Sequence, residues 1–243
     1  MQFNFDLPNN IITIIFSVLS WGFISFLVIR QFLKQEVKPV LWRAILVALI
    51  GLGAFSLNIT LFHTSVKLPI LPLGVWFVYF LLKKTTFQLY RRFAWIGFWA
   101  NFVFLIATLL SALTHSWVYP KGQVSTYVAN VNDAAIIRIV PSTSEAYFHK
   151  EQFMKQLKEL KPTPIESDNW YRAIVLESES PSNYRKEKFP YQLVGAMPKW
   201  GSGIATEIYI EEDSKGILIT TANQQYYYRS TEPLIERGAD SDE

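Results

Sequence analysis

Residues 11–29, IITIIFSVLSWGFISFLVI, form a run of nineteen side chains without a charge. A helix of this length rises about 28 Å, which matches the roughly 30 Å thickness of the hydrocarbon layer of a bilayer. Three further apolar runs follow, at 44–62, about 66–82 and 93–113. Their number and length predict a membrane protein whose first domain, residues 1–115, is a four-transmembrane-helix bundle.

The third run is shorter than the others and contains Pro69 and Pro72 near its start. Proline is tolerated best in the first turn of a helix, where its missing backbone donor costs least. The run therefore either crosses the membrane or forms a re-entrant hairpin, and the distribution of charge favours the crossing.

Basic residues lie on alternate connections between the apolar runs. One basic group follows the first run and another precedes the last: Arg30, Lys34, Lys38, Arg43, Lys83, Lys84, Arg91 and Arg92. The remaining connection holds Lys67 alone. Because loops rich in Lys and Arg stay in the cytoplasm, we expect a multi-pass protein of the cell membrane with both termini outside and membrane lipid around it. The first run has no basic segment before it, so we do not expect a cleaved signal peptide.

The two halves of the chain differ in charge. Residues 1–115 carry nine Lys or Arg and two acids, whereas residues 116–243 carry fourteen Lys or Arg and eighteen acids. The chain has no cysteine, and its single N-x-S/T triplet, 58–60, falls inside an apolar run. An acidic outer half without disulfides or an accessible glycosylation site favours a bacterial cell envelope.

Residues 116–232 predict a small extracytoplasmic α+β domain of mostly antiparallel sheet with one amphipathic helix. Period-two patterns indicate strands at 127–131, 135–140, 170–176, 191–196, 204–210, 216–221 and 224–229. In the helix, one apolar face contains Phe153, Met154, Leu157 and Leu160. Residues 233–243 predict an acidic C-terminal tail that frays.

The outer domain shows no catalytic constellation. It has no nucleophile elbow, no glycine-rich phosphate loop and no clustered metal ligands, so we expect a non-enzymatic protein without a cofactor. Its acidic character argues against nucleic acid as a partner. His63 and His115 end two apolar runs on the outer side; they either share a cation with Asp6 or serve as polar anchors at the membrane boundary.

One glycine-dense segment is a candidate for ligand or partner contacts: Lys199, Trp200, Gly201, Ser202 and Gly203. It offers backbone donors beside an aromatic side chain; the alternative is a flexible connection between two strands. Polar residues inside the apolar runs are candidates for interhelical contacts: Ser17, Ser20, Ser25, Asn58 and Asn101. Depth along the helices predicts that the first helix supplies a hydroxyl partner for at least one asparagine.

Two functions remain open on the sequence. The leading interpretation is a cell-envelope protein whose outer domain binds another membrane or envelope protein, or an envelope ligand, in a sensing, regulatory or assembly role. The alternative is a small transport or channel component that acts as an oligomer. No ionisable residue lies within the apolar runs 11–29, 44–62 and 93–113, which counts against ion coupling.

Overall fold

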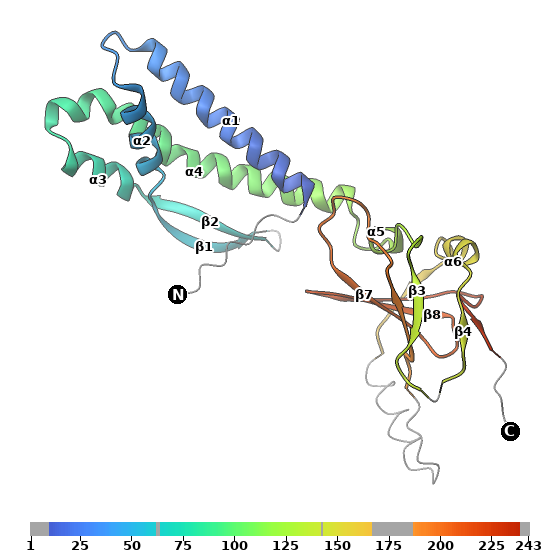
Figure 1. The fold of residues 1–243 in the computed structure, drawn as a ribbon. Helices are drawn as coiled ribbons and strands as arrows, with labels where there is room; N and C mark the ends of the chain where they lie inside the picture. Colours follow the sequence, from blue (N-terminus) through green and yellow to red (C-terminus); the bar gives the residue numbers. More distant parts are fainter. Residues whose placement is uncertain (1–9, 62–63, 142, 167–186, 239–243) are drawn as a thin grey trace. The chain divides into compact units, whose positions relative to one another are not determined.

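The computed structural model describes residues 10–61, 64–141, 143–166 and 187–238 (Figure 1). The chain divides into two compact units, Met1–Val118 and Tyr119–Glu243. Each unit has a hydrophobic core of its own, built from residues of that unit alone.

Within its described residues, the first unit contains helices and one β-hairpin. In chain order they are α1 (Ile11–Lys34), α2 (Leu41–Gly51), β1 (Phe55–Leu61), β2 (Thr64–Leu71), α3 (Leu73–Leu81) and α4 (Lys84–Val118). Among the described segments, α1 and α4 alone are long and apolar enough to cross a membrane. Length and composition by themselves make this weak evidence for a membrane location.

The helices α1 and α4 pack side by side in opposite directions (Figure 1). Near one end of the pair, Thr13 Oγ1 lies 2.9 Å from Ser111 Oγ. Near the other end, Gln35 Nε2 donates a hydrogen bond to the carbonyl oxygen of Leu89 (3.1 Å). The beginning of α1 therefore lies beside the end of α4.

The prediction of a four-helix transmembrane bundle is not supported. The second apolar run, 44–62, divides into α2 and β1, and the third, about 66–82, divides into β2 and α3. With eleven and nine residues, α2 and α3 rise only about 16 Å and 14 Å, half the thickness of a hydrocarbon layer. The described structure thus provides two candidate spans in place of four.

Alternation of side chains explains why a hairpin forms where mean hydropathy predicts a helix. Residues 56–61 read S-L-N-I-T-L, a period of two that suits a strand. Across the hairpin, Asn58 lies opposite Lys67, and Ile59 lies opposite Val66. Val66 is buried, whereas Asn58 and Lys67 are exposed, so the hairpin has an apolar and a polar face. Averaging hydropathy over the run merges these two faces and hides the strand.

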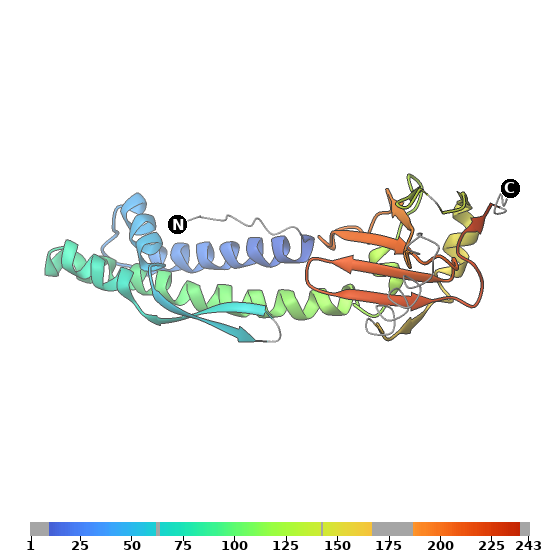
Figure 2. The same ribbon diagram turned by 90° about the horizontal axis from the view of Figure 1, so that it is seen from below.

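Small residues let α2 approach α4 closely. A Cβ atom added to Gly97 would lie 2.0 Å from the carbonyl oxygen of Ala48, and one added to Gly51 would lie 2.2 Å from that of Ala94. Beyond this contact, β2 runs along α4, as both views show (Figure 2). The first unit is therefore assembled around α4, which contacts α1, α2, α3 and β2.

The second unit contains a six-stranded antiparallel sheet of order β3-β6-β7-β8-β9-β5. Its described elements are α5 (Val124–Tyr127), β3 (Ala135–Arg138), β4 (Ala146–Tyr147), α6 (Lys150–Gln156), β5 (Lys161–Thr163), β6 (Tyr191–Val194), β7 (Thr206–Ile210), β8 (Gly216–Thr221), β9 (Gln225–Arg229) and β10 (Glu236–Arg237). This confirms the coarser prediction that a small, mostly antiparallel sheet follows the apolar half.

The core of the second unit lies between the central strands and α6. Cross-strand neighbours Ile208 and Ile219 are almost fully buried, as are Ile210 and Ile217 two pairs along, on the same face. Phe153 of α6 is fully buried in the same cluster. The amphipathic helix therefore covers one face of the sheet, as its apolar stripe requires.

Several segments of the second unit differ from the sequence prediction, among them β4 and β5, which form where no strand was expected. The strand expected at 127–131 is replaced by α5 and one isolated bridge between Asn130 and Met197. The tail expected to fray from 233 begins with Leu234 and Ile235, which are 1% and 3% exposed. These two side chains belong to the core. The prediction missed them because it used the net acidic composition of the tail. The strand predicted at 170–176 lies outside the described residues.

Candidate functional site

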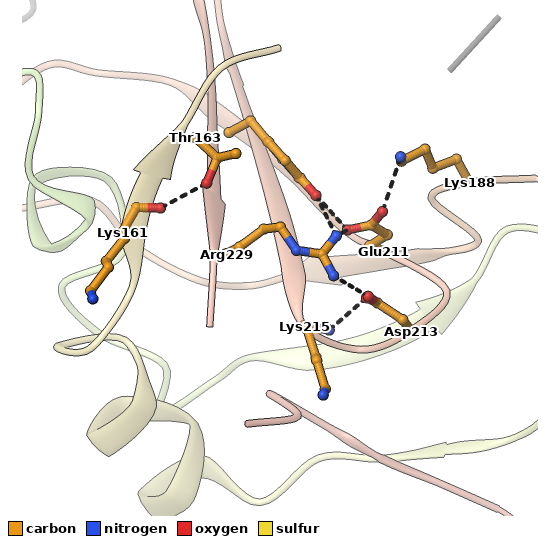
Figure 3. Close-up of polar contacts among 8 residues, drawn as sticks. Lys161, Thr163, Lys188, Glu211, Asp213, Lys215 and Arg229 are labelled. Atoms are coloured by element: carbon orange, nitrogen blue, oxygen red, sulfur yellow. Dashed lines mark hydrogen bonds and ion pairs between the residues drawn. The ribbon is translucent and has the colours of Figure 1, made fainter. Parts of the chain in front are cut away.

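The described ion pairs of the second unit are densest where β7 and β9 end. Glu211 follows β7 directly, and its carboxylate accepts hydrogen bonds from Arg229 Nη1 (2.6 Å) and Tyr227 Oη (2.5 Å). Lys188 Nζ lies 3.2 Å from the other carboxylate oxygen. Arg229 also forms an ion pair with Asp213, and the side chains converge on one another in Figure 3.

The turn between β7 and β8 brings these groups together. The backbone N–H of Glu211 donates to the carbonyl oxygen of Gly216 (2.8 Å), while Gly216 lies opposite Arg229 across β8 and β9. A Cβ atom on Gly216 would lie 1.9 Å from Glu211 Oε2 and 2.8 Å from Tyr227 Oη. A glycine at this position therefore leaves the space that the carboxylate occupies.

The electrostatics of this charged cluster (Lys188, Glu211, Asp213, Tyr227 and Arg229) are balanced, with two acids facing two bases. Burial raises the pKa of Tyr227, and its hydrogen bond to Glu211 raises it further, so the phenol stays a donor. Burial alone would lower the pKa of Arg229, but its bonds to Tyr227 and Asp213 and the charge of Glu211 raise it overall. Because the cluster satisfies its own charges, its arrangement stabilises the turn.

A cavity of about 790 Å³ borders the same turn. It is lined by Gln152, Asp213, Ser214, Lys215, Pro233, Ile235, Glu236, Arg237 and Gly238. The lining includes both acidic and basic side chains, so the cavity suits a polar partner that carries both charges. Ser214 has a left-handed backbone (φ 62°), and its hydroxyl has no hydrogen-bond partner among the described residues.

The predicted contact segment belongs to a well-defined turn, residues 197–203, called here the Trp200 turn. The backbone N–H of Lys199 donates to Thr126 O (3.0 Å), and Tyr119 Oη donates to the carbonyl oxygen of Trp200 (2.9 Å). Gly201 and Gly203 adopt φ values of 75° and 67° that favour glycine. Ser202 is buried at 3%, whereas the Trp200 side chain is 80% exposed. The segment is therefore a turn held by hydrogen bonds, with the Trp200 side chain exposed at its tip.

The polar residues of the apolar runs lie in different surroundings. Ser20 Oγ donates to Phe16 O within α1 (2.7 Å), Ser17 is half-buried, and Ser25 is exposed. Asn101 Nδ2 donates to Leu52 O (3.1 Å), which joins α4 to the end of α2.

Asn58 lies on the polar face of β1 opposite Lys67. The hydroxyl pair that joins α1 to α4 is Thr13 with Ser111, which the sequence interpretation did not single out.

The charged cluster and the cavity were also missed. A usable signal was present: Glu211 directly follows one period-two strand and Arg229 ends another. In a meander these two strands flank β8 and run in the same direction, so their carboxyl ends lie at the same edge of the sheet. Among the described residues, no group of three or more His, Cys, Asp or Glu side chains could hold a metal ion. His63 and Asp6 of the suggested cation site lie outside the described residues. No known protein family, curated protein or solved structure matches the chain.

Proposed function

We propose that the chain is a non-enzymatic cell-membrane protein, anchored by α1 and α4, whose second unit binds a partner protein or envelope ligand outside the cytoplasm. The supporting observation is the exposed apolar surface of the two helices. In the most apolar eighteen-residue stretch of each helix, only 22% is buried inside the structure. Val18 and Leu19 of α1 are 64% and 62% exposed, and Ile106 of α4 is 56% exposed. A continuous apolar surface of this kind is stable in lipid and costly in water.

Charge supports the orientation. Because α1 and α4 are antiparallel, the segment from Arg30 to Arg92 connects two candidate spans on one side of the membrane. This segment carries nine basic residues and one acid, Glu36. Eight of these bases lie at the two ends of the segment, residues 30–43 and 83–92. The positive-inside rule puts these ends on the cytoplasmic side, and the second unit then lies outside.

The binding role rests on the cavity beside Ser214. Its lining combines Lys215 and Arg237 with Asp213 and Glu236, and a built hollow of mixed charge favours a polar peptide or headgroup over an apolar ligand. Copurification from detergent-solubilised membranes tests this role. The double variant K215E/R237E should lose the partner, while K158E/K161E, with the same change in net charge and no residue in the cavity, should retain it. Loss of the partner in both variants, or in neither, would contradict the assignment.

A reporter fused after Glu243 tests the orientation. The reporter is an enzyme that is active only outside the cytoplasm. We expect activity when it is fused after Glu243 and no activity when it is inserted after Glu36. The reverse pattern would overturn the proposed topology together with the outward binding role.

A second candidate is a channel component that acts as an oligomer, because the polar face of the β1–β2 hairpin lies on a strand pair packed along an apolar helix. That face carries Ser56, Asn58, Thr60, Ser65 and Lys67. In lipid, such a face and the outer edge of β1 need other partners. A defined homo-oligomer in nanodiscs with ion flux in vesicles supports this function, whereas a monomer without flux excludes it.

A further inference from the structure

We infer that the Trp200 turn is a membrane-interface anchor: it inserts Trp200 among lipid headgroups beside the point where α4 leaves the membrane. The inference rests on the membrane location proposed above. It assigns the lipid surface as the partner of the predicted contact segment, which is a different site from the cavity beside Ser214.

The position of the turn follows from the hydrogen bond between Tyr119 and Trp200. Tyr119 is the residue directly after Val118, with which α4 ends. Its side chain is 5% exposed, and its hydroxyl holds the Trp200 carbonyl oxygen at 2.9 Å. The turn is therefore held to Tyr119, the residue that follows α4 in the chain.

The length of α4 places this point in the headgroup layer. The apolar run ends at residue 113, and residues 114–118 add about 7 Å of helix. A bilayer of about 30 Å hydrocarbon and about 40–45 Å in total leaves roughly 5–8 Å of headgroup layer on each side. Tyr119 then lies where this layer meets water.

The chemistry of the turn matches that layer. Trp200 is 80% exposed and Met197 is 53% exposed, although both lie on backbone fixed by hydrogen bonds. Lys199 Nζ lies 5.7 Å from the centre of the Tyr119 ring, and its residue is exposed. Trp117, two residues before Tyr119, is 84% exposed. Tryptophan beside lysine is the composition that anchors proteins at headgroup level.

The rigidity of the turn favours a binding role over that of a flexible connection between two strands. Met197 exchanges backbone hydrogen bonds with Asn130, and Ser202 Oγ accepts from the backbone N–H of Ile204 (3.3 Å). A preordered turn loses little conformational entropy when its tip is buried. The exposed indole can then enter the interface without rearrangement of the sheet.

Spin labels test the inference in the full chain, because the absence of native cysteine makes every introduced cysteine unique. The protein is reconstituted in phosphatidylcholine–phosphatidylglycerol nanodiscs with one nitroxide on Met197→Cys. Ile106→Cys on α4 is the lipid reference and Asn223→Cys, on the exposed β8–β9 turn, is the water reference. Relative accessibility to oxygen and to a water-soluble nickel complex reports the depth.

The expected result is that the label at 197 has a several-fold higher oxygen-to-nickel ratio than the label at 223, and that W200S lowers it towards the water value. Water-like behaviour at 197, or no effect of W200S, with a lipid-like label at 106 would overturn the inference and leave the membrane location intact. The turn would then be open to a partner protein. A water-like label at 106 would overturn both the membrane location and the anchor.

Discussion

Glu211 Oε2 lies 2.6 Å from Arg229 Nη1, and this contact joins the turn after β7 to the last residue of β9. Only 8% of the Glu211 side chain is exposed, against 37% of the Arg229 side chain. The acid is thus the interior member of the pair, and the base connects it to Asp213 at the surface. A buried carboxylate so arranged depends on its cations for stability.

Glu211→Gln should destabilise the second unit, because Arg229 and Lys188 then keep their charges without the central acid. We expect a loss of about 2 kcal/mol, below the 3–5 kcal/mol typical of a broken buried pair since Arg229 is partly exposed. Chemical denaturation followed by far-UV circular dichroism measures it. Glu232→Gln, at an exposed position, is the control and should change little.

The stability of the second unit should fall as the pH rises above about 10. Burial raises the pKa of Tyr228 to about 12, and Tyr127 and Tyr227 are raised in the same direction. The unfolded chain therefore releases these protons at lower pH than the folded chain, which favours unfolding from the unfolded pKa upwards. Between pH 10 and 12 the unfolding free energy should fall less steeply with pH in Tyr228→Phe. The difference in slope is at most that of one titrating proton, about 1.4 kcal/mol per pH unit. An unchanged slope would contradict the burial of this phenol.

Gly97→Ala should weaken the contact between α2 and α4, because the new Cβ would lie 2.0 Å from the backbone of Ala48. Overpacking of this kind costs about 1–3 kcal/mol. The matched control is Gly22→Ala on α1, where a Cβ meets nothing within 4 Å. Thermal unfolding in detergent should show a lower midpoint for Gly97→Ala alone; equal midpoints would exclude the close approach.

Removal of the residues after Pro233 should destabilise the second unit by at least about 3 kcal/mol, because Leu234 and Ile235 leave its core. A chain that stops after Gly238 keeps both side chains and should melt like the full chain. Resistance to limited proteolysis distinguishes the two truncations. Equal resistance would show that these residues contribute no packing.

Asn101→Ala should lower stability by about 1 kcal/mol, since the amide bond to the Leu52 carbonyl at the end of α2 is lost. Ser25→Ala, at an exposed position of α1, should leave stability unchanged. Unfolding in a denaturing detergent measures both. A larger effect of Ser25→Ala than of Asn101→Ala would contradict the exposed position of Ser25.

The sequence was sufficient for features that depend on long, regular patterns. The two longest apolar helices and the strands at 191–194, 206–210 and 216–221 follow from uninterrupted runs or alternation that packing reinforces. The helical face around Phe153 was equally clear. In each case one local pattern agrees with the burial that the fold imposes.

The remaining features depend on contacts between distant residues. The hairpin at β1 and β2 is stabilised by pairing such as Asn58 with Lys67, and a hydropathy average carries no information about pairing. The burial of Leu234 depends on its backbone bond to Ser214, twenty residues earlier (2.6 Å). The cavity beside Ser214 exists only where the β7–β8 turn meets the C-terminal segment. No local pattern could predict these relationships.

The alternation within β1 and β2 makes the first unit sensitive to frame shifts of a single residue. One residue inserted between Gly53 and Phe55 would rotate every following side chain of β1 by half a turn and put Asn58 on the face that Ile59 now occupies. Two inserted residues would restore the original faces and only displace the strand along its partner. Natural variation in this segment is therefore expected to proceed in steps of two residues, a rule of parity that the helices beside it do not share.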